Sequence, residues 1–202
     1  MPNATDRSGI LVPISSEAYL QIGNDMVEGE NPYYFNNVPD LGDSKGATYN
    51  DENVIGRAVP IKTFSNGDNR SLSLSINLFV QVQSDCRRNL RILRRIQSAV
   101  YPRPGLSSTI PYMPPNICKL KVGSLLSECP ICVVMKDYNV RFPTDVPWDA
   151  ETLCPYRMEI SMSFEQVFSS DNLPNNTKIL ADTPGSQGCA TNNKLPRILL
   201  AA

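Results

Sequence analysis

The chain contains no histidine among its 202 residues. Histidine is the side chain most often used as a general base near neutral pH, and it is also the commonest metal ligand in proteins. Its absence excludes every Ser-His-Asp and Cys-His mechanism. Only carboxylate or lysine chemistry remains open to an enzyme here. We therefore expect a non-enzymatic protein that uses no cofactor.

Long apolar runs are missing as well. No segment approaches the roughly 20 apolar residues that cross a membrane. The polar N-terminal residues and the short apolar segment 10–14 do not form a signal peptide. The formal net charge of -1 provides no bulk attraction to nucleic acid or to an anionic membrane. We expect no membrane partner and no specific contact with nucleic acid.

Regular alternation of apolar and polar residues predicts several strands. The clearest is 71–82, where leucine, isoleucine and valine alternate mainly with serine, asparagine and glutamine. Segments 118–122, 129–142 and 156–164 carry the same signal, and 54–64 is a further strand interrupted near its proline. A period of two places one face of each strand in a core and the other in water or a polar lumen.

One helix is predicted between these strands, over residues 84–100. Its apolar side chains recur at helical spacing, Ser84 or Asp85 can cap its start, and Tyr101-Pro102 ends it. Strands grouped on either side of a single helix are typical of an α+β domain, and they resemble neither a βαβ series nor a helical bundle.

The polar face of this predicted helix is rich in arginine. Such a face can bind phosphate groups, can be solvated, or can pair with acidic groups of another subunit. The slightly acidic balance of the chain favours the subunit interface over nucleic acid, as does the lack of aromatic residues among these arginines. The interface candidates on the helix are Arg87, Arg88, Arg91, Arg94 and Arg95.

Both ends of the chain are predicted to be extended arms, over residues 1–53 and 169–202, because they show little regular pattern. Within the first arm, 10–14 and 18–22 could each form a short strand. The tract 28–53 is rich in Asn, Asp, Gly and Pro. Either it is a plain surface loop, or it becomes ordered on a partner with Tyr33, Tyr34 and Phe35 as anchors. Residues 54–168 then form the central β-rich domain.

The six cysteines do not form a dense framework. We expect reduced, buried thiols in a protein made in a cytoplasm. The alternative is a metal or redox site at Cys129 and Cys132, which have the CxxC spacing of half a zinc knuckle. Only Cys118 and Cys154 could supply a second pair. Chelation would also require a turn, because residues three apart on a strand face opposite ways.

Carboxylates are scattered through the predicted loops, and no spacing forces two of them onto one surface. Asp137 and Glu159 lie on the polar faces of predicted strands and could meet across a sheet. Two carboxylates that flank a glycosidic bond are the usual apparatus of a glycoside hydrolase. A carboxylate hydrolase that degrades cell walls is therefore kept as an alternative.

The central region resembles a known class of proteins. It combines Asn31-Pro-Tyr-Tyr and Leu41-Gly-Asp-Ser with Val54-Ile-Gly-Arg-Ala-Val-Pro-Ile-Lys, the alternating strand, the arginine-rich helix and Cys154-Pro-Tyr-Arg-Met-Glu-Ile-Ser-Met-Ser-Phe. This order of turns, strands and helix over residues 30–168 is similar to tail-tube-like and baseplate hub proteins of contractile-tailed bacteriophages.

The resemblance implies an antiparallel β-barrel or sandwich of the tail-tube type, with the long helix packed on it. It implies a structural component of the virion tail or baseplate, made in the host cytoplasm, that assembles in a homo-oligomeric ring around a channel for DNA. The implied partners are tail tube, hub, wedge or sheath subunits.

Other functions stay open from the sequence. A baseplate wedge protein, or a tail connector or terminator outside the tube, is the nearest alternative to a ring subunit. A cysteine-based metal-binding regulator and the carboxylate hydrolase are the alternatives from other classes.

Overall fold

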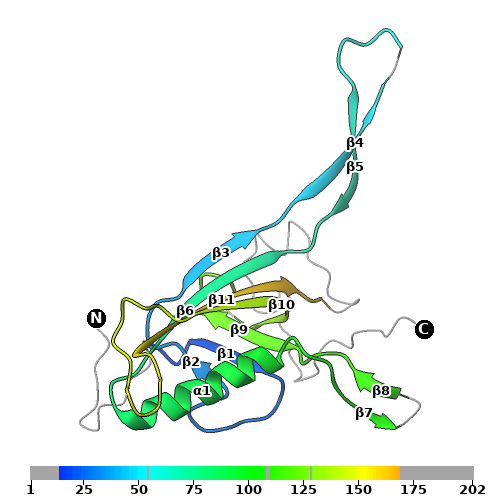
Figure 1. Ribbon diagram of the computed structural model, residues 1–202. Coiled ribbons are helices and arrows are strands. Elements are labelled where there is room, and N and C mark those ends of the chain that lie inside the picture. Colours follow the sequence, from blue (N-terminus) through cyan, green and yellow to red (C-terminus); the bar gives the residue numbers. More distant parts are fainter. Residues whose placement is uncertain (1–13, 54, 108–109, 128, 169–202) are drawn as a thin grey trace.

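The computed structural model of the protein describes residues 14–53, 55–107, 110–127 and 129–168. Its main element is a seven-stranded antiparallel sheet with the strand order β2-β1-β9-β10-β11-β6-β3 (Figure 1). These strands are β1 (Ala18–Ile22), β2 (Tyr33–Tyr34), β3 (Asp40–Ser44), β6 (Ser71–Phe79), β9 (Cys118–Val122), β10 (Ile131–Arg141) and β11 (Arg157–Gln166).

One helix and two hairpins accompany the sheet. The helix is α1 (Gln83–Ser98), which follows β6. One hairpin pairs β4 (Ala47–Glu52) with β5 (Ile61–Gly67), and the other pairs β7 (Arg103–Ser107) with β8 (Ile110–Met113). The expectation of a β-rich α+β fold is confirmed: the sheet curves as an antiparallel half-barrel with α1 against it. Helix α1 is neither long nor apolar enough to cross a membrane, and no other helix is found in the described residues.

The core lies between α1 and one face of the sheet. In the β6–β11 pair, Leu72 lies opposite Phe164 and Ile76 lies opposite Ile160. All four side chains are buried. Full burial of one such side chain contributes about 1.5–3 kcal/mol to folding. The alternation read from 71–82 and 156–164 therefore marks the two central strands of the core.

Strand β10 changes its apolar phase halfway along. Its buried residues Ile131, Val133 and Met135 occupy odd positions, whereas the partly buried Tyr138 and Val140 occupy even positions. The register against β11 shifts between Met135 and Asp137, which is the signature of a β-bulge. The extra residue keeps both halves of the strand turned toward the same core.

The opposite face of the sheet is polar. The hydroxyl oxygens of Ser75 and Ser161 lie 2.8 Å apart across β6 and β11. On the same face, Arg157 Nη2 lies 2.9 Å from Glu159 Oε1, and Lys136 Nζ lies 3.5 Å from Glu165 Oε2. The sheet therefore has one face covered by α1 and one face of small hydroxyls and paired charges.

The prediction that residues 1–53 form an arm needs correction. Strands β1, β2 and β3 come from this segment and belong to the main sheet. Leu20 and Ile22 of β1 are buried in the core. The short strand considered at 18–22 is present as β1. Strands β2 and β3 have two and five residues and are too short to show a period, so the sequence did not reveal them. Residues 1–13 and the predicted C-terminal arm, 169–202, lie outside the described residues.

Candidate functional site

Helix α1 sorts its side chains into a buried set and an arginine-bearing surface. Asp85 holds the start of the helix, because its Oδ2 accepts hydrogen bonds from the backbone N–H groups of Gln81 and Val82 at 3.2 and 3.1 Å. The N-cap residue is Val82 and neither Ser84 nor Asp85, so the predicted cap is wrong by position. Asp85 acts from the third helical residue, three positions after the N-cap. The apolar side chains that α1 buries are Cys86, Ile92, Leu93 and Ile96.

The connection between β1 and β2 forms a tight loop beside this helix. The buried Asn31 accepts a hydrogen bond from Ile22 N and donates one to Ile22 O, both at 2.9 Å. Val27 N also donates to Asn31 O at 2.8 Å. These bonds satisfy backbone groups that burial would otherwise leave unpaired. The loop is thereby fixed next to the surface of α1.

Two of the five predicted arginines bind this loop. Arg88 Nε donates a hydrogen bond to Gly29 O at 3.0 Å, and Arg91 Nε lies 2.5 Å from Glu30 Oε1. The Glu30 side chain is only 14% exposed, so this ion pair is partly shielded from water. Pairing within the chain was not among the roles expected for the arginine face. No local pattern in the sequence links residues about sixty positions apart.

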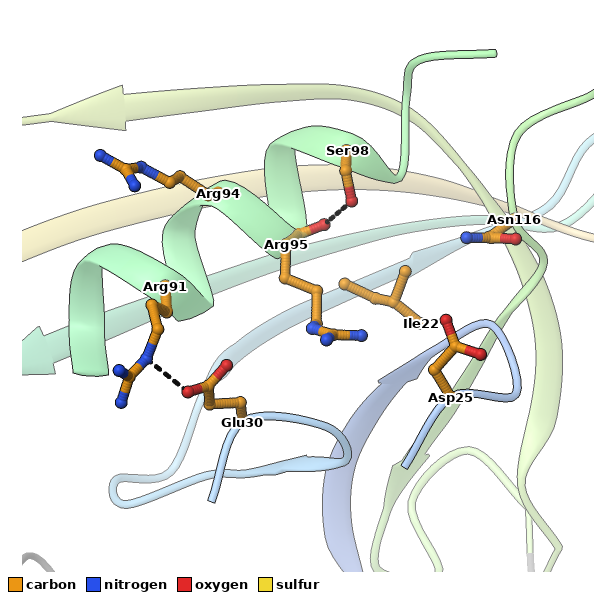
Figure 2. A pocket seen from close by; sticks show the side chains of 8 residues that line it. All are labelled: Ile22, Asp25, Glu30, Arg91, Arg94, Arg95, Ser98 and Asn116. Carbon is orange, nitrogen blue, oxygen red and sulfur yellow. Dashed lines mark hydrogen bonds and ion pairs between the residues drawn. The ribbon is translucent and has the colours of Figure 1, made fainter. Parts of the chain in front are cut away.

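An open pocket of about 390 Å³ lies between α1 and this loop (Figure 2). Arg95 extends toward the loop, and its side chain makes no hydrogen bond or ion pair within the described part of the chain. Arg94, one residue earlier, points away from Asp25 in the same view. The residues that line the pocket are Ile22, Asp25, Glu30, Arg91, Arg94, Arg95, Ser98 and Asn116.

Arg87 lies apart from this pocket. It is exposed near the start of α1 and is not among the lining residues. The predicted arginine face thus has three kinds of position. Arg88 and Arg91 bind the loop, Arg94 and Arg95 line the pocket together with Arg91, and Arg87 lies in water. A guanidinium group presents five N–H donors in a planar fork that matches a carboxylate. The pocket can therefore bind a carboxylate chemically.

The three aromatic interface candidates occupy different environments. Tyr33 and Phe35 are 4% and 1% exposed, and their rings pack against each other with centroids 5.7 Å apart. Burial raises the pKa of Tyr33 to about 12. A partner cannot reach these two rings without opening the core. Tyr34 is 37% exposed and is the one member of the trio that is accessible.

The prediction of reduced cysteines is wrong at three positions. Cys86 on α1 and Cys154 before β11 form a disulfide with a Cα–Cα distance of 6.4 Å, and Cys129 is also disulfide-bonded. Cys86 and Cys154 are 68 residues apart, so their proximity is a property of the fold. Cys118 and Cys132 are free and buried, as expected.

The oxidation and protonation states of these cysteines disfavour a metal site at the CxxC motif. A disulfide-bonded Cys129 offers no thiolate, and burial raises the pKa of Cys132. Burial also raises the pKa of Cys118 to about 12, and only the thiolate form is a good metal ligand. Within the described ranges, no cluster of three or more His, Cys, Asp or Glu side chains could hold a metal ion.

The predicted carboxylate pair does not form. Asp137 lies opposite Ser163 and accepts a hydrogen bond from its hydroxyl group. Glu159 lies opposite Arg141, four residues further along β10, and pairs with it and with Arg157. Each carboxylate has its own local partner, so the sheet does not assemble the pair that a glycoside hydrolase needs.

The feature that sequence reasoning missed most completely is the β4–β5 hairpin. It projects far from the body as a continuation of β3 and β6 (Figure 1). Every residue of both strands is exposed. Its one aromatic pair, Tyr49 opposite Phe64, packs with ring centroids 5.7 Å apart. The strand predicted over 54–64 was partly wrong: only its residues from Ile61 onward belong to β5, and residues 55–60 lie in the connection between β4 and β5.

Comparison with known proteins gives no family assignment. No protein-family model matches the chain, and no curated protein matches it at a significant level.

Proposed function

We propose that this chain is a non-enzymatic structural subunit of a contractile phage tail. It assembles in a homo-oligomeric ring of the tail tube or baseplate and binds neighbouring tube, hub, wedge or sheath proteins. The class of protein comes from the resemblance of the central region to tail-tube-like and baseplate hub proteins. Separate support comes from two features of the fold that suit contact with other proteins: the projecting β4–β5 hairpin and the two-faced sheet.

The observation that carries the proposal is the projecting β4–β5 hairpin. A two-stranded hairpin on its own is marginally stable in water, because neither face buries apolar surface. This hairpin nevertheless keeps apolar side chains 39–102% exposed, at Tyr49, Ile55, Val59, Ile61 and Phe64. Aromatic residues are typical anchors of protein interfaces. A neighbouring subunit that covers the hairpin would supply the burial it lacks.

The two-faced sheet agrees with the same assembly. Its apolar face is covered by α1, while its polar face presents Ser75, Ser161 and paired charges. In a ring, a face of this kind is suited to line a water-filled channel through which DNA passes. Joining of sheets between subunits would also remove the exposed edges at β2 and β3, which otherwise invite uncontrolled pairing.

The test is the assembly state of the purified full-length chain, measured by light scattering and negative-stain microscopy at increasing protein concentration. We expect closed rings, or incorporation into tails when the other tail proteins are present. The double variant Tyr49→Ser/Phe64→Ser should abolish assembly without unfolding the body, because both side chains lie outside the core. Ser at both positions keeps the backbone of the hairpin but removes its aromatic pair.

The matched control is Tyr112→Ser, which removes an equally exposed tyrosine from the other hairpin. It should leave assembly intact. A chain that stays monomeric and never joins a particle would refute the proposal. Incorporation into particles without ring formation would instead favour a wedge, connector or terminator role.

A further inference from the structure

We propose that the pocket beside Arg95 binds a carboxylate group from an acidic segment of a partner protein. This inference rests on the proposed role of the chain as an assembly subunit, and it names the chemistry of one contact. It concerns the surface between α1 and the β1–β2 connection, at the opposite end of the molecule from the β4–β5 hairpin (Figure 1).

The charges of the pocket leave room for one added anion. Three guanidinium groups, of Arg91, Arg94 and Arg95, share the pocket with the carboxylates of Asp25 and Glu30. Glu30 is already paired with Arg91 at 2.5 Å. The pocket therefore has a net positive charge, and that charge is concentrated at the two arginines that no ion pair engages among the described residues.

Arg95 is the one arginine of the pocket that is partly buried and also lacks a partner among the described residues. It is partly buried, it lies at the pocket, and its side-chain donors are unpaired within the described ranges. Its backbone carbonyl, in contrast, accepts a hydrogen bond from Ser98 Oγ at 2.7 Å (Figure 2). The side-chain donors of Arg95 face an open pocket that water can enter. A carboxylate can replace that water and accept two charge-assisted hydrogen bonds from them at once.

The remaining lining suits an Asp or Glu side chain. Asn116 contributes an amide that can donate to an oxygen, and Ile22 contributes apolar surface for methylene groups. The volume of about 390 Å³ falls at the small end of the range for specific binding pockets. An acidic side chain with its neighbouring backbone fits this description better than a large ligand does.

The same lining disfavours nucleic acid. A polyanion carries one charge at each phosphate, and Asp25 and Glu30 would repel the phosphates on either side of the one bound at Arg95. A protein segment can place a single carboxylate in the pocket and keep neutral residues near the two acidic groups. The geometry therefore points to a protein partner.

The experiment measures binding of a fluorescein-labelled peptide with one glutamate among glycines and serines, the glutamate peptide, to the full-length chain by fluorescence anisotropy. The same peptide with glutamine in place of glutamate and a labelled single-stranded oligothymidylate serve as the neutral and nucleic-acid probes. We expect the glutamate peptide to bind and the glutamine peptide not to bind. Arg95→Gln should weaken the binding about tenfold, since it removes charge-assisted hydrogen bonds. Asp25→Asn should strengthen it, because it removes a repulsive carboxylate from the pocket.

The matched control is Arg87→Gln, which removes the same charge from the same helix outside the pocket. It should change binding by less than about twofold. Equal weakening by Arg95→Gln and Arg87→Gln would overturn the inference, since it would show nonspecific attraction to the helix. Tighter binding of the oligothymidylate, or no binding of the glutamate peptide, would overturn it as well. Thermal unfolding of each variant establishes that it is folded.

Ring formation separates this inference from the proposed function. If Arg95→Gln loses the peptide but rings still form, both proposals stand and the pocket binds a different neighbour. If the glutamate peptide binds through Arg95 but neither rings nor incorporation into particles occur, the proposed function fails while the carboxylate site remains.

Discussion

Two antiparallel ribbons of this protein use similar residues in opposite ways. In the β6–β11 pair, Phe164 lies opposite Leu72 and is fully buried beneath α1. In the β4–β5 hairpin, Phe64 lies opposite Tyr49 and is 59% exposed. Both ribbons are antiparallel, so the main difference lies in whether another layer covers them. The body buries its apolar side chains, whereas the hairpin leaves its apolar side chains exposed.

The largest difference between the two ribbons is expected from a matched pair of Phe→Ala substitutions. Phe164→Ala should lower the free energy of unfolding by about 3–5 kcal/mol, because it leaves a cavity in a packed core. Phe64→Ala should change it by less than about 1 kcal/mol, because it removes only an exposed cross-strand contact. Urea unfolding of the two purified variants provides the measurement.

The comparison fails if the two variants lose similar stability. That outcome would mean that the isolated chain buries Phe64, for example by folding the hairpin back on the body. The assay must be run at concentrations where the protein is monomeric, since assembly would stabilise the hairpin as well.

The disulfide should affect the body and leave the hairpin unchanged. It joins α1 to the segment before β11 and closes a 68-residue span, so its loss should cost about 2–4 kcal/mol through the entropy of the unfolded chain. The double variant Cys86→Ser/Cys154→Ser should therefore melt at a lower temperature than the parent chain. Differential scanning calorimetry measures the shift in melting temperature. Reducing agent cannot act on this bond in the variant, because both of its cysteines have been replaced.

Limited proteolysis tests whether the hairpin opens locally more easily than the body. Among the described residues, trypsin should cut first after Arg57 or Lys62, because exposed β-ribbons open locally at little cost in free energy. The nicked protein should keep a melting temperature within about 2 °C of the intact chain, since the core is untouched. Mass spectrometry of early fragments identifies the sites, and a first cut within β6 or β11 would contradict the prediction.

The smallest expected effect lies at the junction of the two ribbons. Arg70 donates to Asp43 at 2.8 and 2.5 Å, and this hydrogen-bonded pair lowers the pKa of the Asp43 carboxyl from its usual 3.8. A lowered folded-state pKa means that the stabilisation is present above pH 3.8 and is lost as pH falls through the folded-state value. The pair is partly exposed, so the effect should stay below about 1 kcal/mol.

The measurement for this pair is a stability profile between about pH 2 and pH 6, which spans the titration of the carboxyl group. Asp43→Asn should remove part of the acid-dependent loss of stability and leave the profile flatter at its acidic end. A variant profile parallel to that of the parent chain would show that the pair does not contribute.

Some of the candidate site was predictable and some was not. The spacing of Arg88, Arg91 and Arg95 is enough to place them on one helical face, because a helix repeats about every 3.6 residues. Arg88 and Arg91 bind Gly29 and Glu30, which lie in a loop with no periodic pattern. The sequence near these residues therefore does not indicate that they pair. Similarly, the aromatic triplet 33–35 stands out in the sequence, but the burial of its outer members depends on β1 and α1.

The sequence by itself determined the class of the fold and the two faces of its central strands. Alternation over 71–82 and 156–164 is a local property, and it decides which side chains can face a core. Tertiary structure decided the bond between Cys86 and Cys154, the pocket at Arg95 and the exposure of the β4–β5 hairpin. Each of these depends on the distance between remote segments, or on whether a layer covers a ribbon. Such distances arise only when the elements pack together.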